Sequence, residues 1–191
     1  MQHRYAPAFL AAVLLAPLAA SCGRGTLPNT TVPDTRENRQ VIDVAERYRR
    51  AVESMDTRAL IGMASERYFE DAGTPQGDDD YGIEGLRRLL AVWTEEVRGV
   101  RYEIRYRSVT FEQNGSRALI DYTYTGSFTL RRPPLQLPEG VEARQGSMLN
   151  VDPVRGATPV NTDREVWFRR VADNRLELER DGSEWRIVAG M

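Results

Sequence analysis

The spacing of apolar side chains changes once along the chain, and this change limits the folds that the chain can adopt. Before about residue 100, apolar residues recur every three or four positions, as on one face of a helix. From Arg101 onward they recur every second position, as in strands with one buried face. Helices followed by a mostly antiparallel sheet make an α+β arrangement, which is the fold class we predict.

Three helices are expected in the first part. The first follows Asp34 and Glu37, which stand at capping-box spacing, and runs to about Ser54. Asp56 caps a short second helix, and the third starts near Ile83. Between them, residues 68–82 are predicted to form a loop, because Gly, Pro and a run of Asp interrupt any periodic pattern.

The strands are expected to pair as hairpins around an Asn114-Gly115 turn and an Asp181-Gly182 turn, with a bulge or turn at residues 172–174. Residues 131–162 contain five prolines and three glycines, and a connection of that length is either a functional lid or disordered. The strand positions predicted to face inward include Tyr102, Tyr106, Tyr122, Tyr124, Leu176 and Leu178.

Residues 1–21 have the pattern of an export signal, with an apolar run of 15 residues at 6–20 that is shorter than the roughly 20 needed to span a bilayer. The segment ending in Cys22 resembles a bacterial lipobox, although Ala19 stands where leucine is usual. Lipidation would explain the only cysteine, and an ordinary signal with an incidental cysteine is the alternative. Gly23 then implies the outer membrane, facing the periplasm. We expect a tether over 22–37 and one domain over 38–191.

The composition excludes several kinds of chemistry. All 26 basic residues are arginine, and the only histidine, His3, lies in the predicted signal. The mature chain therefore has no imidazole base, no lysine Schiff base and no histidine or multi-cysteine metal site. Asp78-Asp79-Asp80 lacks the alternating ligand order of a calcium loop, so we expect neither a metal nor another cofactor. A net charge of −2 gives no electrostatic reason to expect nucleic-acid binding.

The order of elements, the sequence GIEGLRRLL and the closing LERDGSEWRIVAGM resemble the nuclear-transport-factor-2-like superfamily, which includes ketosteroid isomerase, SnoaL-like cyclases and scytalone dehydratase. The resemblance covers roughly residues 38–191 and implies a cone of three helices on a curved sheet. AERYRRAVESMD resembles the first helix of ketosteroid isomerase, which implies that Tyr48 donates to an oxyanion. YFEDAGT implies that Asp71 is the base. Leu176 stands where that enzyme has a protonated aspartic acid, so one oxyanion donor is missing.

The residues themselves do not decide between two roles for each candidate site. Tyr48 is either an oxyanion donor or a core tyrosine, and Asp71 is either a base drawn inward or a loop aspartate. The inward face is either a filled core or a ligand pocket, formed by Tyr68, Tyr102, Tyr106, Tyr122, Tyr124 and Leu176. Two functions follow. A non-catalytic lipoprotein would bind a small apolar ligand or a protein partner, which includes a second copy through the sheet. Alternatively, a carboxylate-dependent isomerase, dehydratase or cyclase would use Asp71 and Tyr48.

Overall fold

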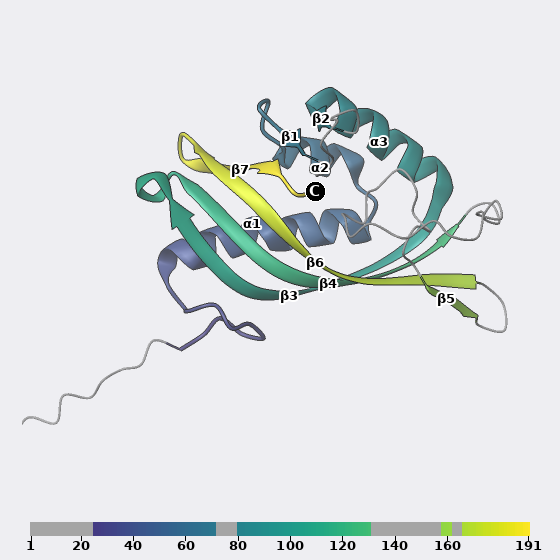
Figure 1. The fold of residues 1–191 in the computed structure, drawn as a ribbon, viewed down its shortest axis with the longest axis horizontal. Helices are drawn as coiled ribbons and strands as arrows, with labels where there is room; N and C mark the ends of the chain where they lie inside the picture. The colour runs from purple at the N-terminus through teal and green to yellow at the C-terminus, as the bar shows by residue number, and fades with distance from the viewer. Residues whose placement is uncertain (1–24, 72–79, 131–157, 162–165) are drawn as a thin grey trace, which may run out of the picture.

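A computed structural model describes residues 25–71, 80–130, 158–161 and 166–191, and in these ranges the chain is α+β. Three α-helices precede the main sheet, as predicted, and Figure 1 shows them on one side of its curved surface. The elements are α1 (Arg36–Glu53), α2 (Thr57–Met63), β1 (Phe69–Glu70), β2 (Tyr81–Gly82), α3 (Ile83–Glu96), β3 (Val97–Glu112), a 3-10 turn at Gln113–Gly115, β4 (Arg117–Leu130), β5 (Thr158–Asn161), β6 (Val166–Asp181) and β7 (Glu184–Ala189).

The main sheet is antiparallel and has the strand order β3-β4-β6-β5, with β7 also paired to β6. Strand β3 pairs with β4 from Val97 opposite Leu130 to Glu112 opposite Arg117. Strands β1 and β2 form a separate two-stranded sheet. No helix in the described ranges is both long enough and apolar enough to cross a membrane.

The helix boundaries follow the predicted pattern closely, with one difference at the first cap. The Thr35 side chain, not Asp34, accepts the bond from the backbone N–H of Asn38 (3.1 Å). Asp34 instead forms an ion pair with Arg39 (2.5 Å). The predicted cap at Asp56 is confirmed, since its carboxylate accepts a bond from the N–H of Ala59 (2.9 Å).

The strands also follow the predicted alternation, and both predicted turns are present, with positive φ at Gly115 (84°) and Gly182 (59°). The bulge predicted at residues 172–174 is wrong, because β6 pairs with β4 without a register shift there. One of the shifts in the main sheet lies in β3, between Tyr106 and Ser108. Residues 158–161 of the predicted irregular segment form strand β5, and 131–157 lie outside the described residues.

The described part of the predicted tether packs against the domain. Leu27 and Val32 are buried, and Thr26 bridges to Pro33. The hydroxyl of Thr31 donates to the backbone carbonyl of Arg107 in β3 (2.6 Å). Residues 25–35 are therefore part of the folded structure, although their composition is typical of a tether.

Gly190, just past β7, allows the chain to approach β6 closely. Its φ is +90°, and a Cβ at this position would lie 1.8 Å from the carbonyl oxygen of Arg175. We expect Gly190→Ala to lower the free energy of unfolding by at least about 2 kcal/mol, measured by urea unfolding, because a left-handed backbone and a backbone clash combine. The matched control is Gly62→Ala in α2, where a Cβ meets nothing within 4 Å. An equal effect of the two substitutions would contradict this account.

Candidate functional site

A cluster of four tyrosines joins α1 to the main sheet. The ring of Tyr48 meets that of Tyr102 edge-on, with the centroids 6.1 Å apart and the planes at 87°. Tyr124 lies against both Tyr102 (5.4 Å) and Tyr122 (6.4 Å). Each of the four residues is at most 1% exposed. The predicted inward face is therefore present, and its tyrosines contact one another as a packed core. We call Tyr48, Tyr102, Tyr122 and Tyr124 the tyrosine cluster.

The tyrosine cluster is held in an uncharged state. Burial raises the pKa of Tyr102 and of Tyr122 well above the usual value, so both phenols keep their protons. The side-chain amide of Asn174 donates to the hydroxyl of Tyr122 (3.0 Å). Leu176 is fully buried on the same face, where the resemblance would place an acid. The tyrosine cluster and Leu176 therefore supply no carboxylate to act on a substrate.

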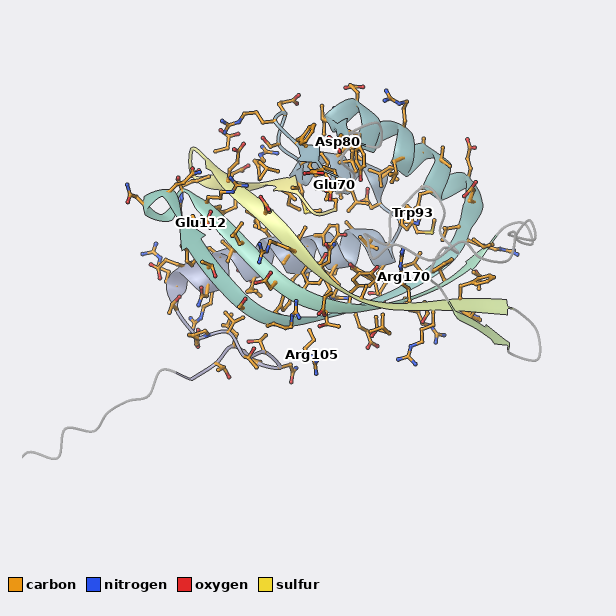
Figure 2. All side chains as sticks on the ribbon, in the orientation of Figure 1. Glu70, Asp80, Trp93, Arg105, Glu112 and Arg170 are labelled. Atoms are coloured by element: carbon orange, nitrogen blue, oxygen red, sulfur yellow. The ribbon has the colours of Figure 1, made fainter. Side chains whose placement is uncertain are left out.

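Sequence reasoning missed a buried cation near this cluster. Arg170 on β6 is 3% exposed, and its charge acts on the pKa of Tyr124, lowering it against the larger rise caused by burial. Figure 2 shows Arg170 on the helix side of the sheet and Arg105 on the opposite side. Counting back from Leu176 in steps of two along β6 would have placed Arg170 inward.

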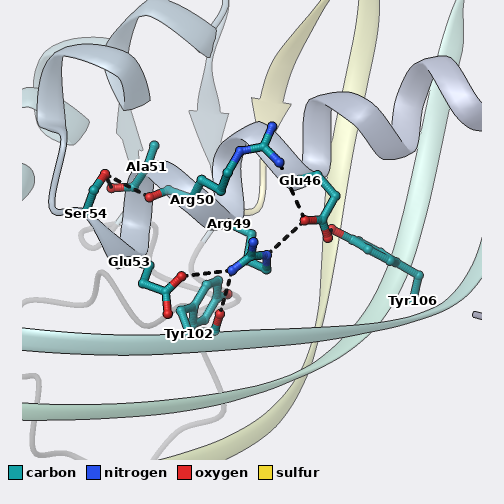
Figure 3. Close-up of polar contacts among 8 residues, drawn as sticks. All are labelled: Glu46, Arg49, Arg50, Ala51, Glu53, Ser54, Tyr102 and Tyr106. Atoms are coloured by element: carbon teal, nitrogen blue, oxygen red, sulfur yellow. Dashed lines mark hydrogen bonds and ion pairs between the residues drawn. The ribbon is translucent and has the colours of Figure 1, made fainter. Parts of the chain in front are cut away.

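Tyr106 on β3 lies outside the tyrosine cluster and contacts α1. Its hydroxyl donates to Glu46 of α1 (2.8 Å), whose other oxygen accepts from Arg49 (2.9 Å) (Figure 3). Arg49 also pairs with Glu53 (2.9 Å). Burial raises the pKa of Tyr106. Glu46, Arg49 and Tyr106 line a cleft of about 580 Å³ between residues 27–30, α1 and β3.

The carboxylate that β1 turns inward is Glu70, not Asp71. Asp71 is exposed, whereas Glu70 is half-buried and lies near β7 in Figure 2. One oxygen of Glu70, Oε2, accepts from the hydroxyl of Tyr68 (2.9 Å) and from the backbone N–H of Gly190 (2.6 Å). The physical reason is the strand period of two, which puts Glu70 on the side of buried Tyr68 and puts Phe69 and Asp71 on the other.

The surroundings of Glu70 favour its neutral form. Burial is the largest cause and raises its pKa, and the nearby charges of Glu177 and Asp71 add to the rise. The bonds from Gly190 and Tyr68 oppose it. Burial also raises the pKa of Tyr68, and it raises that of Tyr81 to about 12. Glu70 is therefore a carboxyl group that exchanges a proton closer to neutral pH than an ordinary glutamate does.

Glu70 and Asp71 line a second cleft, of about 680 Å³, at the end of the sheet where β7 finishes. We call it the Glu70 cleft. It has charged walls and a short apolar stretch, lined by Arg67, Phe69, Glu70, Asp71, Gln113, Arg117, Asn174, Arg175, Glu177, Glu179, Val188, Ala189 and Gly190. In the described ranges, no group of three or more His, Cys, Asp or Glu side chains is arranged to hold a metal ion.

No family model matches the chain, and no curated protein is similar to it in sequence. Solved structures do match. A ketosteroid isomerase-like protein from Erwinia carotovora atroseptica has a TM-score of 0.53 at 14% identity, with 82% of this chain and 95% of that chain covered. A putative scytalone dehydratase from Novosphingobium aromaticivorans has a TM-score of 0.54 at 8% identity, covering 81% and 80%. An NTF2-like superfamily protein from Salmonella enterica serovar Typhimurium has a TM-score of 0.53 at 9% identity, covering 81% and 87%.

The chain has the nuclear-transport-factor-2-like fold. At these identities the likeness shows the fold alone. Within this fold, the structure brings Tyr48 together with three of the predicted pocket tyrosines and places Leu176 on the same buried face. It places Tyr68 beside Glu70 and places Tyr106 in the cleft at α1. Asp71 lies on the Glu70 cleft, whose lining does not include Tyr48, and Cys22 lies outside the described residues.

The raised pKa of Glu70 predicts how Glu70→Gln changes stability with pH. Below about pH 4.3, the ordinary value for glutamate, the carboxyl is protonated in both the folded and the unfolded chain. As the pH rises through the higher folded pKa, the unfolded chain ionises more readily, and the wild type loses stability that the glutamine variant keeps. The stability of Glu70→Gln relative to wild type should therefore increase from pH 4 to pH 7 in urea unfolding.

The control for this measurement is Glu66→Gln, which makes the same chemical change at an exposed side chain of the same segment. A stability difference between Glu70→Gln and wild type that stays flat, or decreases with rising pH, would show that Glu70 is not destabilised by burial of its charge.

Proposed function

We propose that this protein is an outer-membrane lipoprotein whose nuclear-transport-factor-2-like domain, a cone of helices on a curved sheet, binds a small molecule or a partner without catalysis. The observation that carries the proposal is the placement of the two residues expected to catalyse. Tyr48 is fully buried in the tyrosine cluster, and Asp71 is exposed on a cleft that Tyr48 does not line. A base and an oxyanion donor must act on one substrate, so these two residues do not make a site.

The packing of the tyrosine cluster directs our proposal to sites at the surface. The tyrosine cluster and Leu176 leave at most 1% of each residue exposed, so these side chains serve as the core that holds α1 on the sheet. The two clefts described above remain as sites for a small ligand. The outer face of the sheet carries polar side chains such as Arg105 and Thr123, and pairing of two copies through it remains a prediction for sedimentation to test.

The anchor part of the proposal rests on Cys22 and the apolar run before it. Replacing Cys22 by Ser should move the protein from the outer-membrane fraction to the soluble periplasmic fraction, because a cysteine sulfur is required to receive the lipid. Fractionation of the host followed by immunoblotting measures this change. Ala19→Leu, which strengthens the lipobox, is the control and should keep the protein in the membrane. A Cys22→Ser variant that stays in the membrane would contradict the anchor.

The binding part is tested by native mass spectrometry of the full lipidated protein, purified from its own host in detergent. A reproducible non-covalent adduct is expected, and it should persist in Tyr48→Phe, because Tyr48 is fully buried in the tyrosine cluster and lines neither cleft. Loss of the adduct by more than about tenfold in Tyr48→Phe would favour the catalytic alternative instead.

A second candidate function is supported by Glu70. A half-buried carboxyl with a raised pKa, beside the hydroxyl of Tyr68 and open to a cleft, is what a proton-transferring isomerase, dehydratase or cyclase requires. Incubating the protein with its recovered ligand in deuterated water separates the two functions. A base that removes a carbon-bound proton introduces deuterium into the ligand, and Glu70→Gln would abolish that exchange. A binding protein leaves the ligand unlabelled.

A further inference from the structure

We propose that the Glu70 cleft takes a small organic cation, a primary ammonium or guanidinium group on a short apolar stem, with Glu70 holding the cationic group and Val188 and Ala189 packing against the stem. The inference rests on the proposed binding function and names the ligand class for one of its clefts. This cleft lies beside β1 and β7, and its lining contains none of the residues of the tyrosine cluster.

The arginines of the Glu70 cleft already have partners. Arg67 pairs with Glu179 (2.5 Å), and Arg117 pairs with Glu177. Arg175 pairs with Asp121 of the neighbouring strand (2.7 Å). Each guanidinium therefore already has a carboxylate beside it, and an anionic ligand would have to compete with that carboxylate.

Glu70 differs from the carboxylates of these pairs, because the two groups that donate hydrogen bonds to it are uncharged. Within the described part of the chain it makes no ion pair, and its oxygen Oε2 is held by the phenol of Tyr68 and the amide of Gly190. Its second oxygen, Oε1, makes no hydrogen bond there, and the residue lines the cleft. A carboxylate charge in partial burial is costly without a countercharge. A ligand cation at Oε1 would supply it.

The apolar side of the cleft fits the stem of such a ligand. Val188 and Ala189 line the cleft next to Gly190, whose N–H donates to Glu70 (2.6 Å). Phe69 also lines the cleft and is 53% exposed, but it lies on the other side of β1 from Glu70. The volume of about 680 Å³ is in the range of small-molecule sites.

Other ligand classes fit less well. An anionic ligand would meet Glu70 together with the charges of Asp71 and Glu177, which already act on Glu70. A neutral apolar ligand would cover Val188 and Ala189 but leave the Glu70 charge uncompensated and further desolvated. Only a cation with an apolar stem uses both features at once.

The charge state of Glu70 sets the pH dependence of binding. The groups that face Glu70 are Tyr68 just before β1, Tyr81 of β2, Asp71 after β1, Glu177 of β6 and the N–H of Gly190. Both tyrosines stay neutral at physiological pH because their pKa values are raised. A protonated Glu70 has no charge to offer, so affinity for a cation should rise as the pH rises through the titration of Glu70.

The test uses the full lipidated protein in detergent and ligand-detected NMR titrations with n-butylammonium and n-butylguanidinium. The neutral and anionic controls are n-butanol and butyrate, which share the stem. At pH 7 we expect at least one cation to bind, and both controls to bind about tenfold more weakly or worse, because they lack the charge. Glu70→Gln should weaken binding of the cation about tenfold, because it removes the countercharge. Glu66→Gln should leave binding unchanged.

Circular dichroism melts of each variant verify that the fold is kept, and glutamine retains the shape and the acceptor oxygen of Glu70. The inference is overturned if butanol or butyrate binds as tightly as the cations, if Glu70→Gln binds them like wild type, or if neither cation binds. In that event, an adduct seen by native mass spectrometry would still support the proposed binding function. Absence of any adduct together with absence of cation binding would count against both.

Discussion

The packing of Tyr48 against Tyr102 fixes how α1 lies on the main sheet, and the rest of the structure depends on it. Tyr102 contacts Tyr124, which contacts Tyr122, so one side chain from the helix and three from two neighbouring strands form a single buried cluster. Aromatic rings bury a large apolar area and prefer edge-on or tilted contacts, which resist sliding of the helix along the strands. The phenols of Tyr102 and Tyr122 remain uncharged because they are buried, so we assign the cluster a role in stability. We place ligand binding at the surface clefts.

At the surface, Glu70 joins two separate parts of the chain. It lies on β1, receives a bond from Tyr68, and is tied to the segment after β7 by the N–H of Gly190. The side chain of Asn174 links the carbonyl of Gly190 (3.1 Å) to the hydroxyl of Tyr122, so the Glu70 cleft and the tyrosine cluster are connected by two hydrogen bonds. A change of charge at Glu70 therefore acts on the hydrogen bonds that join β1, β6 and the segment after β7. For this reason we expect the residue to affect both stability and binding.

Periodicity alone predicts the helices and the inward strand face, because each is a local property of successive side chains. The start of α3 near Ile83 and the burial of Tyr122 and Tyr124 follow from it, whereas the cap at Asp56 follows from the preference of aspartate for that position. The inward turn of Glu70 does not. Strand β1 has two residues, and its partner β2 lies after an intervening stretch rich in Gly and Asp, so nothing local indicates a strand. The packing of residues 25–35 depends in the same way on a distant partner, β3.

The central claim is that Glu70 is a partly buried carboxyl group whose pKa is raised and which makes no ion pair within the described residues. The most direct measurement is a ¹³C NMR titration of the Glu70 side-chain carboxyl in the folded protein, assigned by its loss in Glu70→Gln. The account predicts a midpoint above about 4.3, the ordinary value for glutamate, and a lower midpoint once n-butylammonium is bound. A midpoint at or below the ordinary value in the ligand-free protein would contradict it.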